Sequence, residues 1–307
     1  MAMASSPINR IALHGALLVW TAKGPTALKS LKVGDKVMPG RNHRWRVTMV
    51  NRIGIALIAL VWCLPLHVSA ETYGCGEFPL LDDSVPKEER AEMLLKRALA
   101  CVKEGKTFQS IALFSELIGL QPNNLDAYLN RGSAYIQSGQ FELGMADYSH
   151  VISLKPDAME AWYNRGTAFV LAHQYDRAIA DLSEAIRLKP DTARAYCNRA
   201  LAYMEKSDYD NALSDLTTGI QKDARLPLCY FVRGNLYSKK EDYQKAIEDY
   251  TQALQLKPDN PGELVKRGEA YEHLGERDKA LADFKAAVAI APGFKEAEQG
   301  VKRLSQD

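Results

Sequence analysis

Cysteine and histidine are the residue types here with the most evident chemistry, and their spacing matches no common reactive site. After residue 70 these types occur at Cys75, Cys101, His150, His173, Cys197, Cys229 and His273. None of them forms an HExxH or CxxC motif or a close Cys–His group, the arrangements typical of metal sites. The sequence also has no GxxxxGK[ST] phosphate loop and no GxSxG nucleophile elbow. We therefore expect no catalytic residue, no metal and no cofactor.

Charge is distributed unevenly along the chain. The 307 residues include 39 Lys or Arg and 38 Asp or Glu. Residues 1–70 contain nine of the basic residues and one acid, Asp35, which leaves 30 basic and 37 acidic residues in 71–307. Nucleic-acid binding requires a basic surface on the folded part, so this mildly acidic body argues against a nucleic-acid partner.

The basic N-terminal part contains an export signal. Residues 53–66 are uncharged and mostly apolar, arginines precede them, and the small residues Val68, Ser69 and Ala70 follow. This order is typical of a secretory signal peptide, here residues 49–70, cleaved after Ala70. We expect a periplasmic or secreted protein that inserts in no membrane after cleavage. The alternative is an uncleaved signal anchor at 53–70, which would tether the protein to the membrane. Since Met49 could start this signal peptide, residues 1–48 are expected to be a non-native or disordered extension.

The rest of the chain repeats itself every 34 residues. Prolines are separated by steps of 34, 34, 68 and 34 residues, and Ala224 occupies the place of the missing one. These prolines are Pro122, Pro156, Pro190, Pro258 and Pro292. If the proline is position 32, positions 8 and 20 are always Gly, Ala or Ser, and positions 11 and 24 are nearly always large. Small residues let two helices approach closely, and large ones fill the space between successive units.

This pattern resembles the tetratricopeptide repeat (TPR) family over residues 91–292. The resemblance implies an all-α fold, a right-handed superhelical solenoid of six helix-turn-helix repeats with a C-terminal capping helix at 295–307. The repeats would be 91–124, 125–158, 159–192, 193–226, 227–260 and 261–294. Residues 71–90 would be a short lead-in, in which Ser84 and Pro86 could begin a helix as N-cap and early helical residue.

The resemblance also implies a function. A TPR solenoid is expected to be a non-catalytic protein–protein interaction module that holds a peptide or partner protein in its concave groove. The alternative is a structural or assembly scaffold of an envelope complex, which would self-associate through its end repeats. The sequence identifies no particular partner.

Two charged columns accompany the repeat. Position 7 is arginine in all six repeats, and position 23 is aspartate in five, with Leu113 in the first. Pairing within each repeat leaves only Arg97 without a partner, so we predict ion pairs between the two helices of each repeat. If exposed, each pair would contribute roughly 0–1 kcal/mol.

A third polar column is asparagine at position 6. In this family that position faces the concave groove, and the sequence around Asn164 resembles the asparagine-ladder repeats of the O-linked N-acetylglucosamine transferase superhelix. There the amides hold the backbone of an extended peptide, because an amide both donates and accepts hydrogen bonds. The partner-binding candidates are therefore Asn130, Asn164, Asn198, Tyr163, Phe231 and Asn235. The alternative is that these are solvated polar positions copied by duplication.

The four cysteines after residue 70 permit three disulfide connectivities in an oxidising compartment. Cys197 and Cys229 lie in the first helices of neighbouring repeats, so Cys197–Cys229 is the favoured pair, and Cys75–Cys101 would then join the lead-in to the first repeat. The alternative is four free, mostly buried thiols.

Overall fold

The computed structural model describes residues 20–21, 24–25, 75 and 85–306. The chain divides into two units, residues 1–66 and 67–307. In the first unit the described residues are the strands β1 (Trp20–Thr21) and β2 (Gly24–Pro25), which pair antiparallel with Trp20 opposite Pro25. The predicted signal peptide lies outside the described residues, as does most of the predicted extension 1–48.

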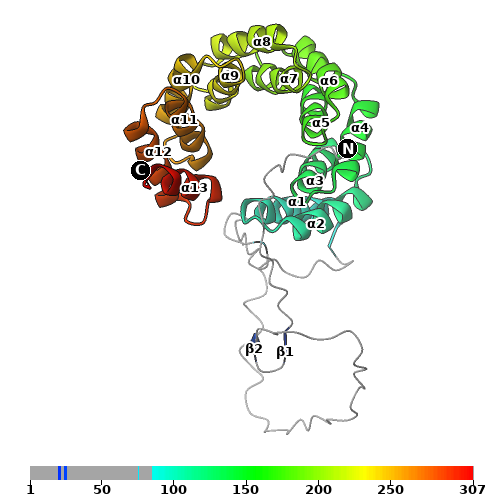
Figure 1. Ribbon diagram of the computed structural model, residues 1–307. Coiled ribbons are helices and arrows are strands. Elements are labelled where there is room, and N and C mark those ends of the chain that lie inside the picture. Colours follow the sequence, from blue (N-terminus) through cyan, green and yellow to red (C-terminus); the bar gives the residue numbers. More distant parts are fainter. Residues whose placement is uncertain (1–19, 22–23, 26–74, 76–84, 307) are drawn as a thin grey trace, which may run out of the picture. The chain divides into compact units, whose positions relative to one another are not determined.

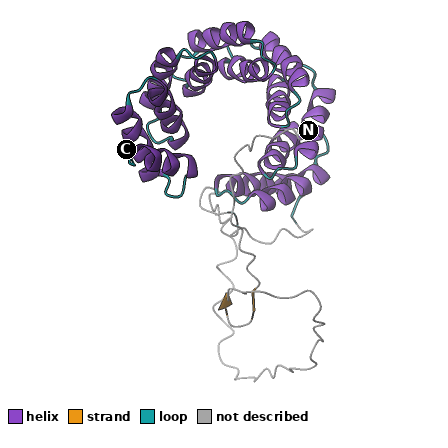
Figure 2. Cartoon of the chain, in the orientation of Figure 1, coloured by secondary structure: helices purple, strands orange, loops and turns teal. Residues whose placement is uncertain are grey.

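The second unit is all-α in its described part, which confirms the predicted fold class (Figure 2). The first helices of the six repeats are α1 (Lys87–Lys103), α3 (Leu125–Gln137), α5 (Met159–Leu171), α7 (Ala193–Glu205), α9 (Pro227–Lys239) and α11 (Pro261–His273). The second helices are α2 (Thr107–Leu120), α4 (Phe141–Leu154), α6 (Tyr175–Leu188), α8 (Tyr209–Lys222), α10 (Tyr243–Leu256) and α12 (Arg277–Ile290). A final helix, α13 (Lys295–Leu304), follows α12.

The helix pairs stack into a curved solenoid (Figure 1). The first helix of each repeat lies in the inner layer and the second in the outer layer, so the first helices line the concave side. Helices α3, α5, α7, α9 and α11 begin at the first residue of each predicted repeat, because the period continues without insertion.

Small residues allow the two helices of a repeat to touch. A Cβ built on Gly144 of α4 would lie 2.8 Å from the backbone oxygen of Gly132 on α3, which no real side chain tolerates. The turn after each first helix also recurs, with a left-handed residue at position 15. That residue is glycine at Gly105, Gly139 and Gly275, where φ is 70°, 80° and 75°.

The first helix starts close to the place that Ser84 and Pro86 predicted. Helix α1 begins at Lys87, about one turn before the repeat register at Ala91, and Pro86 is its N-cap residue rather than an early helical residue. Residues 87–90 are good helix formers, and Glu88 and Glu89 complement the positive end of the helix dipole. The predicted lead-in 71–90 therefore ends as helix.

The C-terminal helix covers the last repeat as predicted. Helix α13 buries Ala297, Gly300 and Leu304, and a Cβ added to Gly300 would lie 2.6 Å from the ring of Phe284 on α12. The polar face of α13 carries Arg303, which bonds Glu272 of α11 at 2.7 and 2.6 Å. Among the described helices, none is long and apolar enough to cross a membrane.

Candidate functional site

An arginine–aspartate pair joins the two helices of repeats 2 to 6, as predicted. Each guanidinium donates from Nε and Nη2 to both carboxylate oxygens of the aspartate 16 residues later; for Arg199 and Asp215 both distances are 2.7 Å. The other pairs are Arg131–Asp147, Arg165–Asp181, Arg233–Asp249 and Arg267–Asp283. The pairs are not exposed, because all five aspartates are only 5–6% exposed where helices pack together, so the small contribution of an exposed pair does not apply.

The same arginines reach into the preceding repeat. Nη1 of Arg199 donates to Ser183 Oγ of α6 at 2.8 Å, and equivalent bonds join Arg131 to Ser115, Arg165 to Ser149 and Arg267 to Thr251. Aromatic rings flank the guanidinium, for example Trp162 at 5.0 Å and Phe169 at 5.9 Å from Arg165. The hydrogen bond to Asp147 raises the pKa of Arg131 above its ordinary value. These charges therefore join the two helices of a repeat and link it to the preceding repeat.

Most of the predicted asparagine column is engaged within the protein. Asn198 is 6% exposed, and its Nδ2 donates to Thr167 Oγ1 at 2.9 Å and to Tyr163 OH at 3.3 Å, both on α5. Asn130 Nδ2 donates to the backbone oxygen of Asp126, 2.8 Å away. Asn164 is half-buried on α5. The structure therefore gives Asn198 a role between repeats, because position 6 of the fourth repeat faces α5 rather than open groove.

The aromatic candidates and Asn235 also have internal contacts. Phe231 packs against the core of its own and the preceding repeat, with its ring 6.0 Å from that of Tyr250. Asn235 Oδ1 accepts a hydrogen bond of 2.8 Å from Tyr250 OH. Tyr163 packs against the apolar cluster that includes Phe169. These three side chains are half-buried and contribute to the groove wall.

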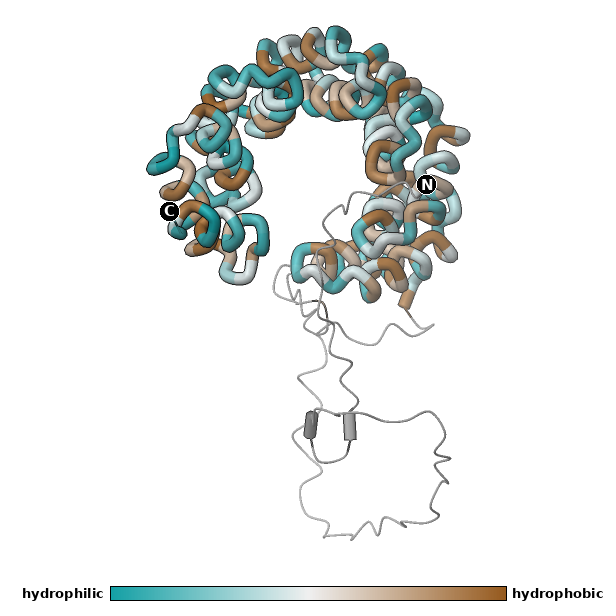
Figure 3. Tube along the Cα trace, viewed as in Figure 1, coloured by the Kyte–Doolittle hydropathy of each residue, from teal (hydrophilic) through white to brown (hydrophobic). Residues whose placement is uncertain are grey.

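The exposed large apolar side chains within the inner helices lie in the N-terminal half, and Leu274, directly after α11, is 42% exposed. Leu99 and Val102 of α1 are 44% and 39% exposed, and Leu171 of α5 is 52% exposed. Hydrophobic turns, brown in Figure 3, occur on the inner helices α1, α3 and α5. Sequence reasoning did not select these residues, although position 12 is apolar in the first four repeats, as Val102, Ile136, Val170 and Met204.

The C-terminal end of the inner layer is polar instead. Ser238, Glu269, Glu272, His273 and Arg303 line a cavity of about 450 Å³ between α9, α11 and α13. The His273 ring stacks on Tyr243 with 4.3 Å between the ring centres. Exposed apolar side chains therefore lie on α1 and α5, whereas charged side chains line the cavity at the C-terminal end.

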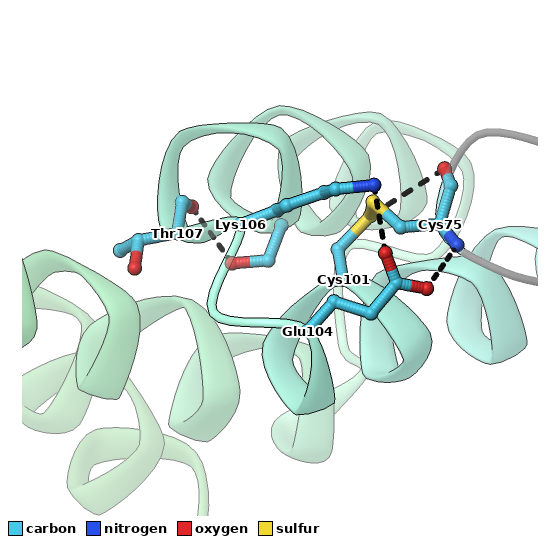
Figure 4. Close-up of a disulfide and its surroundings, with 6 residues drawn as sticks. Cys75, Cys101, Glu104, Lys106 and Thr107 are labelled. Carbon is cyan, nitrogen blue, oxygen red and sulfur yellow. Dashed lines mark hydrogen bonds and ion pairs between the residues drawn. A yellow bond between two sulfur atoms is a disulfide. The ribbon is translucent and has the colours of Figure 1, made fainter. Parts of the chain in front are cut away.

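Both predicted cysteine pairs are joined in the structure. Cys75 bonds Cys101 of α1 (Figure 4). The position of Cys101 carries an aromatic ring in the other repeats. The Cys75 N–H donates to Glu104 Oε1 at 2.7 Å, while Lys106 contacts Glu104 Oε2, also at 2.7 Å, and lowers the pKa of that carboxyl. Cys197 of α7 bonds Cys229 of α9, with 5.2 Å between their Cα atoms.

Glu263 of α11 is a buried carboxyl that sequence reasoning missed. It is 5% exposed, its Oε1 accepts a bond of 2.7 Å from Asn260 Nδ2, and no hydrogen bond reaches Oε2 from the described residues. Burial raises the pKa of this carboxyl above its ordinary value. Three of the equivalent positions in other repeats hold alanine, at Ala127, Ala161 and Ala195, which was the available signal.

Family models match three stretches of the chain. Two described as Tetratricopeptide repeat match residues 234–304 and 125–158, and one described as TPR repeat matches residues 168–207. No curated protein matches the sequence.

Solved structures share the fold. The Cut9–Hcn1 complex of the APC/C matches with a TM-score of 0.65 and 16% identity over 71% of this chain, which spans only 43% of that chain. A tetratricopeptide repeat protein from Parabacteroides merdae matches with a TM-score of 0.60 and 20% identity, covering 70% of this chain and 84% of that one. The pilF protein of Pseudomonas aeruginosa matches with a TM-score of 0.59 and 17% identity, covering 71% and 99%.

Proposed function

Because this chain belongs to the tetratricopeptide repeat family, a family of protein–protein interaction and scaffold modules that are generally non-catalytic, we propose that it holds a segment of a partner protein in its concave groove. The observation that carries the proposal is the exposure of Leu99, Val102 and Leu171 on inner-layer helices. Apolar side chains on a concave surface lose contact with water when a partner covers them, which favours binding.

The groove surface differs from the predicted ladder. Asn198 is committed to Thr167 and Tyr163, so an unbroken row of peptide-binding amides across three repeats is not supported. Asn130 and Asn164 remain candidates on the inner helices α3 and α5. We therefore place the proposed binding surface on the inner faces of repeats 1 to 3.

The experiment is a pull-down with the purified protein from cytoplasmic and extracytoplasmic fractions of the source cells. Leu171→Ser tests the inner layer, and Leu143→Ser on the outer helix α4 is the matched control, since the two leucines are 52% and 48% exposed. We expect Leu171→Ser to weaken capture about tenfold or more and Leu143→Ser to leave it unchanged. Equal capture by both variants, or a loss only with Leu143→Ser, would place recognition elsewhere and overturn the proposal.

The scaffold alternative receives less support. Self-association through both end repeats would need an open C-terminal end, but α13 buries Ala297, Gly300 and Leu304 against the last repeat. At the other end Phe108 of α2 is 71% exposed, and Arg97 Nε is buried without a hydrogen-bond partner among the described residues. Light scattering over a range of concentrations distinguishes the alternatives: a monomer supports the groove proposal, and growth with concentration that Phe108→Ser abolishes supports the scaffold.

We also propose that the protein works outside the cytoplasm. The apolar run 53–66 and its basic flank support export, and the two joined cysteine pairs suit an oxidising compartment. N-terminal sequencing of the mature protein tests cleavage after Ala70; an intact N-terminus in the membrane fraction would favour the uncleaved anchor.

A further inference from the structure

The junction between repeats 4 and 5 lacks a bond found at four others. Arg131, Arg165, Arg199 and Arg267 each donate to a hydroxyl of the preceding repeat. Arg233 bonds Asp249 within its own repeat, but among the described residues it makes no hydrogen bond to Thr217 on α8. The Thr217 hydroxyl donates to the Leu213 backbone oxygen instead.

A polar link that is found before the third and fourth repeats is also missing at this junction. Trp162 Nε1 donates to the backbone oxygen of Pro156 at 2.8 Å, and Tyr196 OH donates to that of Pro190 at 3.2 Å, which ties a repeat to the loop before it. Before the fifth repeat the proline is replaced by Ala224, and the described residues show no equivalent bond from Tyr230. Position 6 here is the apolar Val232, 1% exposed, instead of asparagine.

The Cys197–Cys229 disulfide crosses this same junction. Both residues are fully buried, at 0% exposure, in a cluster with Leu216, Val232 and Leu236. Because they lie on α7 and α9, the bond joins the inner helices of neighbouring repeats directly. A covalent link therefore occurs where the two recurring hydrogen bonds do not.

A glycine on the intervening helix makes room for the sulfur atoms. A Cβ built on Gly219 of α8 would lie 2.8 Å from Cys197 Sγ and 3.0 Å from Cys229 Sγ. At the equivalent place the other repeats carry a side chain, at Leu117, Val151, Ala185, Ala253 and Ala287. Glycine inside a helix is unfavourable relative to alanine, and here the space that it leaves is filled by the two sulfur atoms.

We infer that Gly219, Cys197 and Cys229 form one unit, in which the glycine admits a disulfide that replaces the polar links of the repeat 4–5 junction and holds repeats 5 and 6 in a fixed orientation on repeats 1 to 4. Reduction by a dithiol transfers two electrons and two protons to the sulfurs, which become two thiols while the dithiol closes to a cyclic disulfide. The junction then keeps its apolar contacts and the exposed Lys239–Glu205 ion pair, and it becomes the place where the solenoid bends.

A mutant cycle tests the unit. In the oxidised full-length protein, Gly219→Ala should lower the Tm by about 5 °C, because the new methyl group overlaps both sulfurs. In a Cys197→Ala, Cys229→Ala background the same substitution should be neutral or raise the Tm by about 2 °C, because alanine favours helix and the sulfurs are gone. An equal effect in both backgrounds would overturn the assignment of Gly219 to the disulfide.

Hydrogen exchange tests the role of the disulfide at the junction. Cys197→Ala, Cys229→Ala should speed amide exchange in α8 and α9 about tenfold or more while leaving α3 to α6 unchanged. Cys75→Ala, Cys101→Ala is the matched control and should leave α8 and α9 unaffected. If exchange in α8 and α9 did not change on loss of the central pair, the disulfide would not be what holds this junction.

Discussion

The repeat 3–4 and repeat 4–5 junctions have helices of the same lengths and the same spacing, yet different chemistry joins them. At the first, Arg199 reaches Ser183, Asn198 reaches Thr167, and Tyr196 reaches the Pro190 carbonyl. At the second, a buried disulfide crosses an apolar cluster. The difference teaches that the small and large residues of the repeat determine its geometry. The bond that joins one repeat to the next can be a set of hydrogen bonds or a disulfide.

The largest expected effect concerns an ion pair that lies within the repeat that follows each junction. Asp215→Ala leaves the half-buried guanidinium of Arg199 without its counter-charge and should cost about 3–5 kcal/mol of unfolding free energy. Asp249→Ala should cost about as much, because its pair with Arg233 also lies within one repeat.

Urea unfolding followed by circular dichroism measures both costs. The control is Asp210→Ala, an exposed aspartate on α8, for which we expect a change within about 0.5 kcal/mol. If Asp215→Ala cost as little unfolding free energy as this control, the ion pairs would not stabilise the repeats on either side of the repeat 4–5 junction.

A smaller effect should distinguish the junctions. Ser183→Ala and Thr217→Ala each remove a hydroxyl that donates to its own helix, at Ile179 and Leu213. Only Ser183 also accepts from an arginine of the next repeat, so Ser183→Ala should cost about 1–2 kcal/mol and Thr217→Ala less than about 0.5. Thermal unfolding measures the difference, and equal costs would mean that the arginine bond contributes nothing across the junction.

The smallest effect should be a gain at the repeat 4–5 junction. Asp223 precedes Ala224 with φ −146° and ψ 95°, close to the −141° and 90° of Lys189 before Pro190, so the backbone is suited to a proline. Ala224→Pro should stabilise by about 0.4–1 kcal/mol, because proline restricts the unfolded chain. A lower midpoint in urea would show that this loop departs from the others.

Much of the fold follows from the sequence because the repeat is local and uninterrupted. The proline column locates the end of each second helix, so five first helices start at the predicted residues. The ion pairs were predictable because one arrangement leaves a single arginine unpaired. Ser84 and Pro86 indicated a helix start in the lead-in, and α1 begins at Lys87, before the register of the repeat.

The groove was harder to predict because its surface depends on contacts between repeats. Asn198 and Asn130 occupy the same position of the repeat, yet Asn198 is buried because Thr167 and Tyr163 of the preceding repeat accept its amide. Asn130 instead donates a hydrogen bond to the backbone of its own helix, at Asp126. Aligning the repeats gives the residue types at equivalent positions, but it does not give the residues of the neighbouring repeat that each side chain contacts.

The central disulfide has a mechanical consequence. Tension applied to the two ends of the solenoid would pass from α7 to α9 through the sulfur–sulfur bond, and the helices between Cys197 and Cys229 would carry none of it. The 32-residue separation corresponds to about 110 Å of extended chain that stretching could not release until the bond is broken. The oxidised protein is therefore shorter at full extension than the reduced one, and its middle is the segment that yields last under load.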